Sequence, residues 1–96
     1  MAATNEHHIS DLLSELYRQN DMSSIVDVYQ VRSAYKQVVG ELIARLTQSL
    51  RFESGNLYVR LHSAALRHEM SMRQQSLMDK INELLGRNVV QRIVFQ

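Results

Sequence analysis

The feature that most constrains the fold is a change of hydrophobic period within residues 47–85. Over residues 49–61, apolar side chains alternate with polar ones, which is typical of strands with one buried face. The turn-forming segment 54–56 divides this stretch, so we expect two strands joined by a short hairpin. From Ala64 the apolar spacing becomes helical. A hairpin cannot bury its apolar face alone, and this helix is its expected cover.

Three helices are predicted from the spacing of apolar residues. The first is short and ends near Gln19 or Asn20. The second opens near Ser24, and Gly40, which lies off its apolar stripe, is expected to mark a kink or a close approach by another element. The third covers residues 64–85 and ends at Gly86 in a left-handed cap. The three apolar stripes are Ile9, Leu12, Leu13, Leu16 and Tyr17; Val28, Val31, Tyr35, Val38, Val39, Leu42, Ile43 and Leu46; and Leu66, Met70, Leu77, Ile81 and Leu84.

The predicted order of elements gives a two-layer α+β domain. Residues 89–95 are β-branched and aromatic enough for a third strand, so the order is α-α-β-β-α-β. We expect a three-stranded sheet covered on one face by the helices. The direction and register of the last strand stay open, since a slip of one residue reverses its two faces. The whole chain, residues 1–96, is expected to form one domain with a frayed N-terminus at residues 1–8.

Several classes of function lack their sequence signals. The chain has no cysteine, which excludes a disulfide framework, a cysteine nucleophile and a zinc ribbon. No carboxylates cluster with the four histidines, and neither a nucleophile elbow nor a phosphate-binding loop is present. We therefore predict no enzyme activity, no cofactor and no metal site. No apolar run reaches the length of about 18 residues that a membrane span needs, so a soluble, cytoplasmic protein is expected.

Charge is distributed unevenly along the chain. Residues 1–41 carry three basic and six acidic side chains, a net charge of −3, whereas residues 42–96 carry eight and four, a net charge of +4. The predicted strands place several basic side chains and one aromatic ring on the uncovered sheet face, and two more arginines near its ends. Guanidinium groups for phosphates and a ring for base stacking are what single-stranded nucleic acid requires. The face residues are Arg51, Tyr58, Arg60 and Arg92, with Arg45 and Arg67 near the ends. The alternative is a sheet face that arginines merely keep soluble.

The third predicted helix offers a second candidate surface. Met72 projects away from the apolar stripe, and Arg73 lies close to the edge of that stripe. An exposed methionine beside an arginine fits a protein-binding surface, although a single exposed methionine needs no functional explanation.

Four segments in order along the chain resemble the DciA family of bacterial proteins. They are YKQVVGELIARLT at residues 35–47, GNLYV at 55–59, SAALRHEM at 63–70 and INELLG at 81–86. The resemblance implies a K-homology-like domain that binds DNA and assists loading of the replicative helicase DnaB. This chain departs from the family by having Tyr35 and Leu66 where tryptophans are common. Larger members carry an additional tail, and we expect this chain to be the short, single-domain form. The Gly-x-x-Gly clamp of K-homology RNA binders is also missing.

Three hypotheses follow from the residues and the resemblance together. The leading one is a non-enzymatic adaptor that binds single-stranded or forked DNA through the basic sheet face and acts with the replicative helicase. The second is a protein-interaction module without nucleic-acid binding, for example a homodimer, which uses a free sheet edge or the side of Met72 and Arg73. The third is an RNA-binding protein that uses the same basic face.

Overall fold

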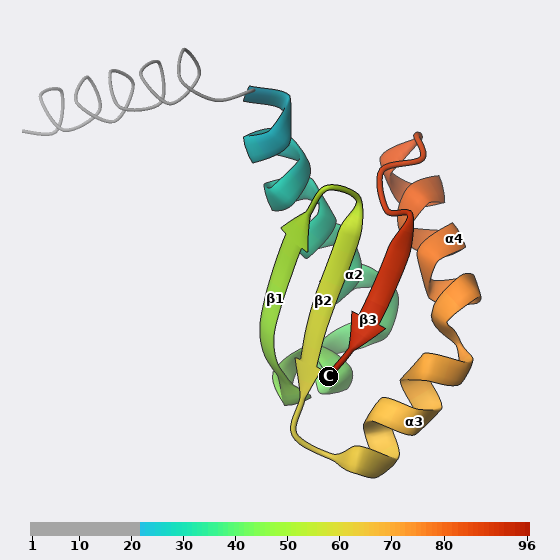
Figure 1. The fold of residues 1–96 in the computed structure, drawn as a ribbon. Helices are drawn as coiled ribbons and strands as arrows, with labels where there is room; N and C mark the ends of the chain where they lie inside the picture. Colours follow the sequence, from blue (N-terminus) through green and yellow to red (C-terminus); the bar gives the residue numbers. More distant parts are fainter. Residues whose placement is uncertain (1–21) are drawn as a thin grey trace, which may run out of the picture.

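The computed structural model describes residues 22–96, which form a mixed α+β fold with the helices packed on one face of a sheet (Figure 1). The first predicted helix lies outside these residues. Within them the chain has three helices and three strands. In order they are α2 (Met22–Leu46), β1 (Thr47–Glu53), β2 (Asn56–Leu61), α3 (Ala64–Met72), α4 (Gln74–Leu85) and β3 (Arg92–Phe95).

The sheet has the strand order β1-β2-β3, with β2 in the centre. The predicted hairpin is confirmed: β1 and β2 are antiparallel, and Ser54 and Gly55 in the turn both have positive φ, as hairpin turns that follow the strand twist require. Strand β3 runs parallel to β2, which settles the direction that the sequence left open. Parallel neighbours need a crossover connection, and α3 with α4 supplies it.

The last strand is shorter than predicted. It begins at Arg92, whereas a strand from Val89 was expected. The reason is a side chain of α4: Asn82 accepts hydrogen bonds from the backbone N–H groups of Val89 and Val90, at 3.0 and 2.9 Å, and donates one to the carbonyl of Val90 at 2.8 Å. The backbone at Val89 and Val90 therefore bonds to Asn82 in place of a strand.

The predicted kink in the second helix is confirmed. Gly40 has φ 86° and ψ 171°, a conformation outside the helical region that is essentially reserved for glycine. This break changes the phase of the helix, so the apolar stripe does not continue as predicted. Leu42 and Leu46 were expected to face the core and are instead 69% and 47% exposed.

The predicted third helix is divided into two. Arg73, with φ −104° and ψ 11°, ends α3 and precedes α4. Met70 and Ile81 are buried as predicted, but Leu84, in the last turn of α4, is 51% exposed. Gly86 ends α4 in the left-handed conformation, which confirms the predicted cap.

The core lies between the helices and one face of the sheet. Strand β2 contributes Leu57, Val59 and Leu61, and all three are almost fully buried. Helix α2 adds Tyr35, whose hydroxyl lies 2.8 Å from the Thr47 hydroxyl; because Thr47 donates its own proton to the carbonyl of Ile43, Tyr35 is the donor between the two hydroxyls. The other face of the sheet has no helix over it within residues 22–96 (Figure 1). None of the helices in this range has the length and apolarity that a membrane span requires.

Candidate nucleic-acid interface

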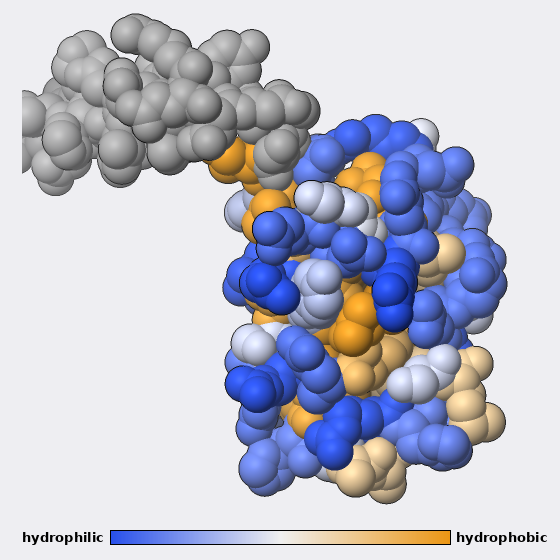
Figure 2. Space-filling view, viewed as in Figure 1, coloured by the Kyte–Doolittle hydropathy of each residue, from blue (hydrophilic) through white to orange (hydrophobic). Residues whose placement is uncertain are grey.

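The uncovered side of the sheet, called here the outer sheet face, is built by alternate residues of the three strands. The apolar partners of these residues point into the core, so the period of two directs polar side chains outward. In the same orientation as Figure 1, the space-filling view shows a mainly hydrophilic surface with a hydrophobic area near the middle of the view (Figure 2). The outer sheet face consists of Ser49, Arg51 and Glu53 of β1, Asn56, Tyr58 and Arg60 of β2, and Arg92 and Val94 of β3.

A stacked pair occupies the centre of the outer sheet face. Arg51 and Tyr58 are direct partners across the hairpin, and the guanidinium carbon of Arg51 lies 4.3 Å from the centroid of the Tyr58 ring. This distance is that of a cation–π contact, which holds the guanidinium plane over the ring. Val94 of β3 is the partner of Tyr58 on its other side. The centre of the face therefore presents flat groups on which a base can stack.

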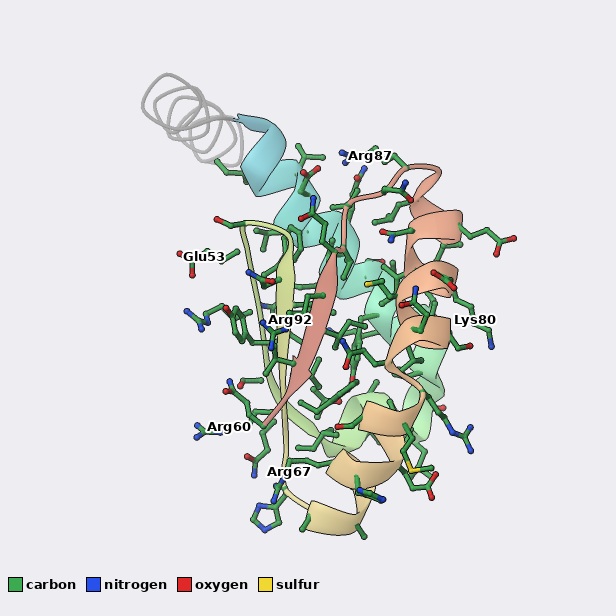
Figure 3. The ribbon with its side chains drawn as sticks, turned by 45° about the vertical axis from the view of Figure 1, so that its right-hand side comes forward. Glu53, Arg60, Arg67, Lys80, Arg87 and Arg92 are labelled. Atoms are coloured by element: carbon green, nitrogen blue, oxygen red, sulfur yellow. The ribbon has the colours of Figure 1, made fainter. Side chains whose placement is uncertain are left out.

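Two further arginines flank the stacked pair. Arg60 is paired across the hairpin with Ser49, and Arg92 is paired across the parallel strands with Asn56. Both side chains are exposed, and neither forms an ion pair with another residue of the range 22–96. Figure 3 shows Arg60 on the side of the sheet away from α4, whereas Lys80 projects from the helical side. The geometry thus brings together four of the six predicted nucleic-acid-binding residues.

The other two predicted residues lie at one end of the sheet, where β1 begins and β2 ends. Arg45 is in the last turn of α2 and forms an exposed ion pair with Glu41, one turn earlier. Arg67 of α3 is half-buried and donates from Nη1 to the carbonyl of Leu61 at 2.8 Å. That bond ties the start of α3 to the end of β2, so Arg67 has a structural role whether or not it contacts a ligand. Figure 3 shows Arg67 near Arg60 at this end.

The prediction did not include Glu53, which shares the outer sheet face with Arg51. The two side chains form an ion pair with Arg51 Nη1 and Glu53 Oε2 3.2 Å apart. Both are mostly exposed, and such pairs contribute little to stability. The signal was present in the sequence, because residues two apart in a strand share a face. Glu53 places one negative charge where a phosphate would approach Arg51.

Of the two predicted partner-binding residues, Arg73 lines a groove on the helical side, and Met72 precedes it in the chain. Met72 is 69% exposed, and Arg73 is exposed and pairs with Glu69, with Arg73 Nη2 and Glu69 Oε2 3.8 Å apart. The groove, called here the three-helix groove, has a volume of about 400 Å³ and an apolar floor with a charged rim. Val38, Val39, Ile43, Leu66, Met70 and Leu77 form the floor, and Glu69, Arg73 and Lys80 stand at the rim. Sequence reasoning missed the groove because it depends on how α2, α3 and α4 meet at the breaks at Gly40 and Arg73.

Tyr35 is an ionisable residue that is buried in the core. Burial raises the pKa of Tyr35 above its ordinary value. Tyr35 belongs to the core between α2 and β1, away from the outer sheet face. Within residues 22–96, no group of three or more His, Asp or Glu side chains is arranged to hold a metal ion.

Comparison with known protein families gives a match over residues 8–95. The matching family is DciA, described as Dna[CI] antecedent, and the match covers nearly the whole chain. The resemblance stated from four sequence segments is therefore confirmed. None of the curated proteins compared with the chain matches it.

Proposed function

We propose that this chain, which belongs to the DciA family, is a non-enzymatic adaptor that binds single-stranded or forked DNA on its outer sheet face. Membership of the family gives a role related to loading of the helicase DnaB in replication. The observation that carries the DNA-binding proposal is the stacked pair of Arg51 and Tyr58, flanked by Arg60 and Arg92 on a face without helices.

The chemistry of this face suits a strand with unpaired bases. Every base has a π face, so a ring with a guanidinium plane over it is a stacking platform that tolerates any sequence. Three guanidinium groups around the platform are available to the phosphates that follow each base. The described order α-β-β-α-α-β is consistent with the K-homology-like domain that the resemblance implies. The three glycines stand far apart, so we place the contact on the sheet and not on a Gly-x-x-Gly clamp.

The first test is binding of a fluorescent single-stranded DNA, followed by anisotropy at several salt concentrations. With three arginines on phosphates and one of their charges offset by Glu53, log affinity is expected to fall with log salt at a slope of about −1.4. The double variant Arg51→Glu with Arg60→Glu is expected to lose binding while its circular dichroism and melting curve stay those of the parent.

A matched control tests whether a loss of binding comes from the outer sheet face or from the change in net charge. Arg73→Glu with Lys80→Glu makes the same change in net charge on the rim of the three-helix groove. Retained affinity in the sheet variant, or an equal loss in the groove variant, would contradict the proposal. An RNA of the same sequence serves as competitor, and preferential displacement of DNA by RNA would favour the RNA-binding alternative.

We further propose that the three-helix groove, with Met72 and Arg73 beside it, is the contact for the helicase. An apolar floor with a charged rim fits an amphipathic helix of a partner protein. Met72→Asp with Arg73→Glu is expected to abolish binding to purified DnaB in a titration by calorimetry, while the sheet variant binds DnaB normally. The reverse pattern would place the helicase contact on the sheet. Light scattering of the free chain tests the homodimer alternative directly.

A further inference from the structure

A second surface with exposed apolar side chains, next to the three-helix groove along α2, covers the first half of α2 and the end of α4. Three of its side chains are large and exposed: Val26 by 39%, Tyr29 by 76% and Leu84 by 51%. Tyr29 and Leu84 line a shallow pocket of about 340 Å³, and Val26 precedes Tyr29 by about one turn of α2. We call this surface the α2–α4 patch; its remaining members, which line the pocket, are Gln30, Ser33, Ala34, Gln37 and Leu85. Clustered exposed apolar side chains mark a surface that another element covers.

We propose that residues 9–17 of the same chain cover the α2–α4 patch as a helix that runs antiparallel to α2. The apolar side chains of this segment recur at helical spacing and form one stripe. A helix with one apolar stripe and no partner is marginal in water, so the segment needs an apolar surface to fold on. The α2–α4 patch is such a surface and lies close along the chain.

The length of the connection fits this arrangement. Residues 18–21 lie between the segment and the start of α2, and antiparallel helix pairs are commonly joined by about two to five residues. Counted outward from this connection, Leu13 stands opposite Val26 and Ile9 opposite Gln30, next to Tyr29. The segment is about 13 Å long as a helix, which matches the first nine residues of α2, Met22 to Gln30, about 12 Å long.

The distance that residues 9–17 can extend along α2 also decides which of the two apolar surfaces they cover. The three-helix groove begins on α2 at Val38, which is about 24 Å from the start of that helix. A helix over residues 9–17 that turns back at residues 18–21 extends along α2 only to about residue 30. The segment therefore covers the part of the α2–α4 patch around Val26 and Tyr29 and leaves the three-helix groove open to a partner.

Charge complementarity supports docking onto the body of the chain. Residues 1–21 carry one basic and four acidic side chains, a net charge of −3, whereas residues 22–96 carry ten and six, a net charge of +4. Opposite net charges favour association within one molecule. The outer sheet face is also basic, but its exposed residues are mainly polar, so it offers no cover for five apolar side chains.

The test uses a paramagnetic label on the full chain. Because the chain has no cysteine, Glu83→Cys places a single nitroxide beside Leu84, and Ser49→Cys places one on the outer sheet face as a matched control. The label at position 83 is expected to broaden the amide NMR signals of residues 9–17, and the label at position 49 is expected to leave them sharp. Leu13→Asp and, separately, Leu84→Asp are expected to abolish the broadening without changing the spectrum of the rest of the chain.

Three outcomes would overturn the proposal. One is the absence of broadening from position 83, and another is broadening from position 49, which would place the acidic segment on the basic sheet. The third comes from a mixture of isotope-labelled chain without nitroxide and unlabelled chain with nitroxide at position 83. Broadening in that mixture would mean that the segment docks on a second copy of the chain.

Discussion

Glu53 opposes DNA binding in the proposed interface, so its neutralisation should strengthen binding. Glu53 is the only acidic residue in the three described strands, and its carboxylate is paired with Arg51 on the outer sheet face. The change Glu53→Gln keeps the size of the side chain and removes its charge. Arg51 then loses its carboxylate partner but keeps its place over the Tyr58 ring. The exposed ion pair contributes little to the fold, so the stability of the variant should be close to that of the parent.

The gain in DNA affinity expected for Glu53→Gln follows from the number of charges on the outer sheet face. With Arg51, Arg60 and Arg92 present and one charge offset by Glu53, the salt slope for single-stranded DNA is about −1.4, and without the offset it is about −2.1. The two slopes differ by about 0.7, so affinities that agree at about 1 M salt differ by about eightfold at about 50 mM. We therefore expect Glu53→Gln to bind more tightly at low salt and equally at high salt.

Anisotropy titrations of parent and variant over that salt range measure both the salt slope and the affinity at low salt. Glu83→Gln on α4 is the control, since it makes the same change in net charge on an exposed residue of the helical side. An unchanged affinity at low salt would refute the assignment of phosphate contacts to Arg51. A gain of equal size at every salt concentration would refute the electrostatic reasoning, and an equal gain from Glu83→Gln would show that net charge alone matters.

Three further predictions concern the residues that hold the interface in place. Gly40→Ala is expected to lower the free energy of unfolding by about 1–3 kcal/mol in urea melts, a purely backbone effect because an added Cβ meets no atom within 4 Å; an unchanged melt would contradict the positive φ. Tyr35→Phe is expected to cost about 1 kcal/mol at neutral pH through loss of the bond to Thr47. Because burial raises the pKa of Tyr35 above 10.0, its contribution is fully present below pH about 10 and is lost as the pH rises through the raised folded-state value; melts up to pH about 11 should show this decline in the parent and not in the variant. Asn82→Ala removes three hydrogen bonds to the segment before β3, and we expect a loss of about 3 kcal/mol in the same urea melts, whereas a loss below about 1 kcal/mol would mean that water replaces them.

The sequence predicts the outer sheet face because alternation within a strand is a local pattern. The period of two is enough to place Arg51, Tyr58 and Arg60 on one side, and the same rule applies to Glu53. The contact between Arg51 and Tyr58 is a different matter, since it depends on the exact register of the hairpin. The position of Arg92 requires the direction of β3, which is set by the crossover and not by the strand itself.

The helical side was predicted less well because its shape depends on packing between distant segments. Gly40 indicates a break, as glycine is the residue that tolerates φ 86°. Nothing comparable marks Arg73, since residues 64–85 contain neither glycine nor proline. The two halves of that stretch pack on different elements, α3 on the sheet and α4 chiefly on α2, so one straight helix does not satisfy both. The three-helix groove follows from this division.

The sheet itself separates the two proposed contacts. Its outer face carries the arginines and Tyr58, while the core and the helices lie between that face and the three-helix groove. A DNA strand and a helicase segment can therefore be bound together without sharing a side chain. Effects of substitutions at such distant sites usually add. A variant that combines Arg51→Glu and Arg60→Glu with Met72→Asp and Arg73→Glu should thus lose DNA affinity and DnaB affinity by the amounts measured for the two double variants separately. A larger loss of either affinity would mean that the strands transmit one binding event to the other.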